Sequence, residues 1–123
     1  MVEGGEEGEK KSKPRMIRVF VKRTRQDPCQ VSIPAEPEAI MDLVGGCPKE
    51  IAVSTDLVIL CDEDGKLTDK SYNCTICGYN FVGTLVFVGI KDDEWADCPL
   101  SYSEFRATFP ALFQSMQPIR KGL

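Results

Sequence analysis

The chain has 123 residues, of which 42% are hydrophobic and 28% charged, and these values are ordinary for one globular domain. No hydrophobic run is long enough to cross a bilayer, and the first residues lack the apolar segment of a secretory signal. We therefore expect a cytoplasmic protein with no membrane partner, in which the six cysteines stay reduced.

Histidine is absent from the sequence. This absence excludes Ser-His and Cys-His nucleophile pairs, histidine general bases and every metal site that uses imidazole. An enzyme of this composition would have to work with carboxylates, thiols, lysine or hydroxyls. We expect a protein that is not an enzyme and that carries no cofactor.

The net charge of −4 is distributed unevenly along the chain. Residues 27–106 hold fifteen acidic residues and five basic ones. Four basic residues cluster just before this segment: Arg18, Lys22, Arg23 and Arg25. A broad basic face for nucleic acid is not expected from this distribution. It is compatible with a protein partner, and equally with a solvated surface of uneven charge.

The first fifteen residues differ in composition from the rest. Residues 1–15 consist of glycine, glutamate, lysine, serine, proline and arginine, with a single aliphatic side chain beyond the first methionine. Such a segment cannot bury enough apolar surface to offset the entropy lost on ordering. We expect a disordered charged tail over residues 1–15 and a single domain over residues 16–123.

Alternating apolar residues predict a first strand over residues 16–23. The odd-numbered positions from Ile17 onward would face the core. The even-numbered positions, Phe20 and Lys22 among them, would lie on the other side of a half-buried strand. A proline-containing turn then leads to a second strand over residues 30–33, which we expect to form a hairpin with the first.

A short helix is predicted over residues 36–44. Pro37 suits the first helical position, and Gly45-Gly46 offers a left-handed exit. Two strands follow, over residues 50–53 and 57–61. The second of these is apolar at every position, which predicts burial on both faces.

The acidic sequence Asp-Glu-Asp-Gly at residues 62–65 predicts a tight turn. A calcium loop is excluded, because placing Gly65 at the sixth loop position would make Leu60 the first ligand. Residues 66–80 show no period and are expected to be irregular. A strand over residues 82–90 follows, and together with residues 57–61 it should form the centre of the sheet.

The last element is a helix with a complete start signal. Ser101 and Glu104 form a capping box, and Pro110 should end the helix after Phe109. Its inward stripe is predicted to be Tyr102, Phe105, Phe109 and Leu112.

Cys74 and Cys77 form a C-x-x-C motif followed by glycine, which is typical of a zinc knuckle. A structural zinc site needs four ligands, so two further cysteines would have to complete it. A redox pair is a weaker interpretation, because the motif does not open a helix. Ordinary reduced thiols are the interpretation that we favour, and we expect no bound metal.

A second motif gathers four carboxylates around the only tryptophan: Asp92, Asp93, Glu94, Trp95 and Asp97. These residues could form an interaction loop in which the aromatic ring anchors a partner. The alternative is a solvated loop whose tryptophan folds back over the sheet.

Several fragments of the chain together resemble one uncharacterised bacterial family. They are EAI at 38–40, LVGG at 43–46, Glu50, DLVILC at 56–61, EDGKL at 63–67, Tyr72-Asn73, GTLVFVG at 83–89, Phe105 and Phe109. The family is domain of unknown function 3846, found in Gram-positive bacteria, their phages and mobile elements. The resemblance covers about residues 16–113. It implies a fold and no activity, and the C-x-x-C motif is not a general feature of the family.

We therefore expect one α+β domain, a mixed or antiparallel sheet of about five strands with two packed helices. The function that we expect first is that of a non-enzymatic accessory protein that binds a host or element-encoded protein. The second is a small-ligand or nucleotide-binding module that uses residues 66–80 and Gly83-Thr84. The third is a cysteine-based zinc or redox protein.

Overall fold

The computed structural model describes residues 15–114 of the chain. Eight strands run through this part: β1 (Met16–Lys22), β2 (Cys29–Pro34), β3 (Pro48–Ser54), β4 (Leu57–Asp62), β5 (Tyr72–Ile76), β6 (Tyr79–Val82), β7 (Leu85–Lys91) and β8 (Glu94–Ala96). Two α-helices and a short 3₁₀ helix complete it: α2 (Pro37–Val44), α3 (Tyr102–Thr108) and η2 (Pro110–Leu112). Of the tail expected over residues 1–15, all but Arg15 lies outside the described residues.

Six of the strands form one antiparallel sheet in the order β2-β1-β7-β4-β3, with β8 paired to β7. Gly89 of β7 pairs with Leu57 of β4 on one edge and with Ala96 of β8 on the other. The strand β8 therefore lies on the same edge of β7 as β1. The expected α+β class is confirmed, with six strands in place of about five, and β7 and β4 are adjacent at its centre.

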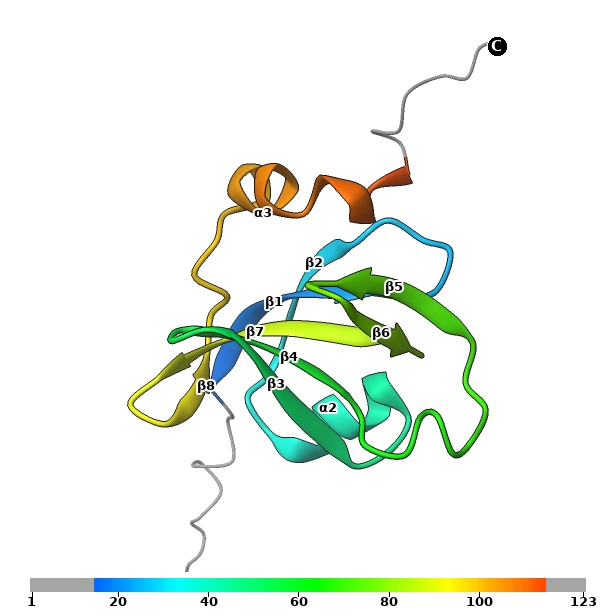
Figure 1. The fold of residues 1–123 in the computed structure, drawn as a ribbon. Helices are drawn as coiled ribbons and strands as arrows, with labels where there is room; N and C mark the ends of the chain where they lie inside the picture. Colours follow the sequence, from blue (N-terminus) through cyan, green and yellow to red (C-terminus); the bar gives the residue numbers. More distant parts are fainter. Residues whose placement is uncertain (1–14, 115–123) are drawn as a thin grey trace, which may run out of the picture.

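Both faces of this sheet are covered, so the fold has three layers (Figure 1). Helix α2 covers one face, where Ile40 and Val44 pack on apolar side chains of the central strands. Helix α3, η2 and the β5–β6 hairpin cover the opposite face, where Phe105 and Phe81 belong to a second apolar cluster. The predicted helix caps are present: Pro37 is the first residue of α2, and Gly45 ends it with φ 77°.

The prediction that β1 is half-buried is wrong. Phe20 is fully buried, and its ring stacks on that of Phe105 with 4.2 Å between centroids. Lys22 is only 4% exposed, on the same side of the strand. The physical reason is that α3, about eighty residues further along the chain, returns to cover the face that local alternation assigned to solvent.

The expectation of an irregular segment over residues 66–80 is also wrong in its second half, which forms the β5–β6 hairpin. Its strands are short, and the two turn residues, Cys77 and Gly78, have φ 51° and 80°. Positive φ at both central positions is the requirement of a type I′ turn, for which the usual signal is Asn-Gly. The following strand accordingly begins at Leu85, since Val82 belongs to β6.

The start of the last helix is as predicted. The Ser101 hydroxyl accepts a hydrogen bond from the Glu104 amide at 3.1 Å, and the Glu104 carboxylate accepts one from the Ser101 amide at 2.8 Å. The helix ends at Thr108, and Pro110 begins η2. The inward stripe needs one correction: Tyr102 is 43% exposed, because it lies at the edge of the aromatic cluster.

Candidate functional site

The acidic motif forms the end of the β7–β8 hairpin, not an irregular loop. Lys91 pairs with Glu94, and Asp92 and Asp93 make the two-residue turn between them with φ 53° and 63°. This backbone matches a type I′ turn, in which non-glycine residues are strained. Both aspartates and Glu94 are exposed. The hairpin thus presents three carboxylates on a backbone with a defined conformation.

The indole of Trp95 lies partly buried beside these carboxylates. It packs against the apolar cluster on the α2 side of the sheet, and its Nε1 donates a hydrogen bond to the Glu50 carboxylate at 2.9 Å. Glu50 is on β3, which β7 and β4 separate from β8 in the sheet. The hydrogen bond therefore links side chains of β8 and β3, and the ring lines a surface groove with Ala35 and Pro37.

Asp97 belongs to a different environment from the other four residues. One of its carboxylate oxygens accepts a hydrogen bond from the Arg18 amide of β1 at 2.8 Å. Arg15 also connects to the hairpin: its guanidinium donates to the Trp95 carbonyl at 2.7 Å and lies 3.7 Å from the Glu94 carboxylate. The structure thus places Asp92, Asp93 and Glu94 together on the surface, with Trp95 beneath them.

An acidic turn beside an aromatic groove offers two non-covalent attractions to a cationic group. Carboxylates attract lysine or arginine side chains over about 8–10 Å at physiological ionic strength. The face of an indole adds a cation–π contact of about 0.5–2 kcal/mol. Charge and an aromatic face together therefore suit this surface to binding.

The basic cluster foreseen near the N-terminus is not one surface. The Arg18 guanidinium donates to the carbonyls of Cys98 at 2.7 Å and Leu100 at 3.0 Å, so it fixes the approach to α3. Burial lowers the pKa of Lys22, and its ammonium donates to the Arg23 carbonyl at 2.8 Å. Two of the four basic side chains thus form hydrogen bonds within the domain.

The C-x-x-C motif spans the tip of the β5–β6 hairpin. Cys74 is partly buried against the core, and Cys77 is exposed in the turn. Within residues 15–114 no group of three or more histidine, cysteine, aspartate or glutamate side chains is placed to hold a metal ion. Burial raises the pKa of the Cys74 thiol, whereas a redox-active cysteine needs a lowered pKa.

Sequence reasoning named residues 66–80 as a possible ligand-binding segment, but it missed the cleft that this segment forms with β3 and β4. Lys49 and Lys66 both lie over the ring of Tyr79, with 5.8 Å and 4.8 Å between ammonium nitrogen and centroid. The three residues come from β3, the loop that joins β4 to β5, and β6, which are separated in the chain. No spacing rule groups them, although two lysines beside one aromatic ring at a cleft offer charge and an apolar surface to a ligand.

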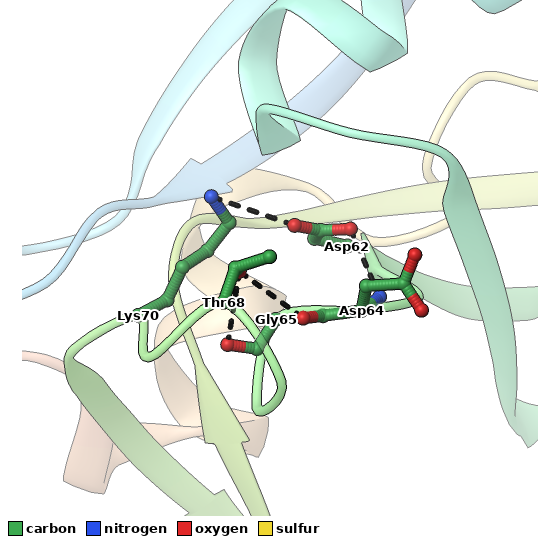
Figure 2. A network of polar contacts seen from close by, with 5 residues as sticks. All are labelled: Asp62, Asp64, Gly65, Thr68 and Lys70. Atoms are coloured by element: carbon green, nitrogen blue, oxygen red, sulfur yellow. Dashed lines mark hydrogen bonds and ion pairs between the residues drawn. The ribbon is translucent and has the colours of Figure 1, made fainter.

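The loop beside this cleft is held by its own polar contacts (Figure 2). The Asp62 carboxylate, 8% exposed, accepts a hydrogen bond from the Asp64 amide at 3.0 Å and lies 3.4 Å from the Lys70 ammonium. The Thr68 hydroxyl donates to the carbonyls of Asp64 at 3.1 Å and Gly65 at 3.3 Å. The tight turn predicted at residues 62–65 is confirmed as the start of this loop.

The space beside Gly83, which the ligand-binding hypothesis assigns to a ligand, is filled by another side chain of the protein. Its φ is 73°, and a Cβ there would lie 2.7 Å from the Lys70 side chain. The glycine therefore accommodates Lys70 and a sharp turn into β7.

In the part of the chain that the structure describes, no helix is long and apolar enough to span a membrane. No curated protein and no solved structure matches the chain. A family model described as Domain of unknown function (DUF3846) matches residues 17–110, which is most of the described fold and includes both the β7–β8 hairpin and the lysine–tyrosine cleft. The chain belongs to this family.

Proposed function

We propose that the chain is a non-enzymatic accessory protein of the cytoplasm that binds a basic partner protein through the acidic end of the β7–β8 hairpin. The partner is a host protein, or one encoded by the phage or mobile element that carries the gene. The phage or mobile-element origin is proposed from the family resemblance, and the binding surface is proposed from the structure of the hairpin.

The observation that carries the proposal is the combination of three exposed carboxylates with a fixed backbone. The turn residues Asp92 and Asp93 both have positive φ, and the Trp95 indole is held by Glu50. Strained backbone that persists in a folded protein is found preferentially at binding sites. Because little conformational freedom remains in the hairpin, docking costs little additional entropy.

The charge of the hairpin also determines how binding should respond to salt. Exposed carboxylates accelerate association with a basic surface, and ions screen this attraction. Loss of the turn charges should therefore slow association. Its effect on dissociation should be smaller, since the partly buried indole of Trp95 would make the apolar contact.

The experiment compares two variants of the full chain as bait for proteins captured from host lysate. Asp92→Asn/Asp93→Gly removes two charges and leaves the Asn-Gly sequence that type I′ turns prefer, so the hairpin stays intact. Asp42→Asn/Asp69→Asn removes two exposed charges elsewhere and serves as the matched control. A specific partner should be lost with the first variant and retained with the control.

Capture of the same proteins by both variants would contradict the proposal. For any partner that passes this comparison, the single tryptophan provides an independent signal. Docking over the groove should shift the wavelength of the Trp95 fluorescence or protect the indole from a soluble quencher. Unchanged fluorescence and quenching at saturation would exclude the groove from the interface.

Binding of a small ligand is the second candidate function, favoured by the cleft around Tyr79. The contribution expected from Gly83-Thr84 is not part of this candidate, because Lys70 fills the space at the glycine. A zinc or redox function has no observation in its favour among the described residues: Cys74 faces the core, and burial raises the pKa of its thiol.

A further inference from the structure

The cleft at Tyr79 carries two positive charges in a domain that is otherwise acidic. The Lys66 ammonium lies over the ring, and the Lys49 ammonium donates a hydrogen bond to the Tyr79 hydroxyl at 3.4 Å. Asn80 and Leu67 complete the wall of a cleft of about 90 Å³, open to solvent. Within residues 15–114 neither Lys49 nor Lys66 forms an ion pair.

In the part of the chain that the structure describes, the carboxylates that border this cleft form no ion pair with Lys49 or Lys66. Asp62 is almost completely buried and is paired with Lys70 and with a backbone amide, as Figure 2 shows. Glu63 also lines the cleft and is exposed to solvent. The two ammonium groups lie 5.8 Å and 4.8 Å from the centre of the Tyr79 ring, so an anion placed between them could accept a charge-assisted hydrogen bond from each.

An apolar groove continues from the same tyrosine. The Tyr79 ring packs on that of Phe81 at 4.5 Å, and both residues line the cleft and the groove. The groove of about 240 Å³ runs between β3 and the β5–β6 hairpin, where Ile51, Val53 and Ile76 form its walls. Val53 is 37% exposed on β3, the outer strand of the described sheet.

We propose that the cleft and the groove together bind a small amphipathic carboxylate. Its carboxylate lies between the Lys49 and Lys66 ammonium groups, within reach of the Tyr79 hydroxyl, and its hydrocarbon part lies along the groove. Each oxygen can accept a charge-assisted hydrogen bond, the stronger class of such bonds. No residue of this site lines the Trp95 groove, so the inference is independent of the proposed protein-binding function.

The chemistry predicts a specific dependence on the ligand. Each methylene buried in the groove should tighten binding about fourfold. Decanoate should therefore bind more tightly than hexanoate, and inorganic phosphate, which has charge and no apolar part, should bind weakly. Decyltrimethylammonium has the same chain and the opposite charge, so it should not bind.

The test is calorimetric titration of these four compounds, below their micellar concentrations, into the full chain and three variants. Lys49→Gln/Lys66→Gln should lower the affinity for decanoate at least tenfold. Lys91→Gln, which removes an exposed lysine elsewhere, should bind decanoate as the wild type does. Val53→Thr keeps the β-branched shape but adds a hydroxyl, and it should weaken decanoate binding. Thermal unfolding of each variant confirms that it is folded.

Three results would overturn the inference. They are decanoate heat that is absent at millimolar concentration, decanoate binding that survives in the folded double lysine variant, and equal binding of decyltrimethylammonium. Phosphate that binds as tightly as decanoate would also overturn it, because the site would then recognise charge alone.

Discussion

Replacement of Phe105 by alanine should remove the centre of the aromatic cluster that joins α3 to the sheet. The side chain is fully buried, and its ring lies 4.2 Å from Phe20, 4.9 Å from Phe87, 5.0 Å from Phe109 and 6.0 Å from Phe113. A buried Phe→Ala change costs about 3–5 kcal/mol, and ring pairs at these distances favour the upper half of that range. Domains of this size have unfolding free energies of about 5–15 kcal/mol, so the loss is a large fraction.

The assay is urea unfolding of the full chain followed by far-UV circular dichroism. With a slope of about 1–1.5 kcal/mol per molar, the midpoint should fall by about 3–5 M. Phe109→Ala is the matched comparison, because Phe109 is only partly buried at the border of the same cluster and its midpoint should fall less. The reasoning is refuted if Phe109→Ala destabilises the domain as much as Phe105→Ala, or if neither changes the midpoint.

Ser101→Ala should lower the free energy of unfolding by about 1 kcal/mol in the same assay, since the capping bond to Glu104 is lost. Asp92→Asn/Asp93→Gly should raise the melting temperature by a few degrees, because glycine relieves the positive φ of residue 93, worth about 1 kcal/mol; a lower melting temperature would show that the aspartates make stabilising contacts. Burial raises the pKa of the three thiols in or against the core above the ordinary value of 9.0: Cys61, Cys74 and Cys98. The unfolded chain gives up these protons first, so stability should be constant near neutral pH and fall as the pH rises above 9.0, less steeply in Cys98→Ala. Protein purified without chelator should contain far less than one zinc ion per chain, and EDTA should leave its circular dichroism unchanged; stoichiometric zinc would make the C-x-x-C motif a metal site.

The elements that local sequence predicts well are those with a complete local signal. Ser101 and Glu104 specify the start of α3 by direct contact, and the uninterrupted apolar run of β4 can only be buried on both faces. The β5–β6 hairpin was missed because Cys77 occupies a turn position where asparagine is usual. Phe20 was assigned to the wrong environment because the helix that covers it lies far away in the chain.

The two candidate sites also differ in how much of each can be predicted from local sequence. The acidic turn is contiguous in sequence, so composition alone identifies Asp92, Asp93 and Glu94, but the Glu50 bond that holds the indole depends on strand order. For the cleft, a linear search finds the segment 66–80 but does not connect it with Lys49. Lys49 and Lys66 meet over Tyr79 only because the β5–β6 hairpin folds back across β3 and β4.

The cover of β1 by α3 has a consequence for the order of folding. Phe20 near one end of the described chain stacks on Phe105 near the other, and Arg18 donates hydrogen bonds to carbonyls about eighty residues away. A ribosome-bound chain that ends before residue 101 could pair β1 with β2 and β7, but it would expose the aromatic face of the sheet. Contacts of such separation slow folding, and the exposed face is prone to association until α3 emerges. Completion of the domain is therefore coupled to the release of its last helix from the ribosome.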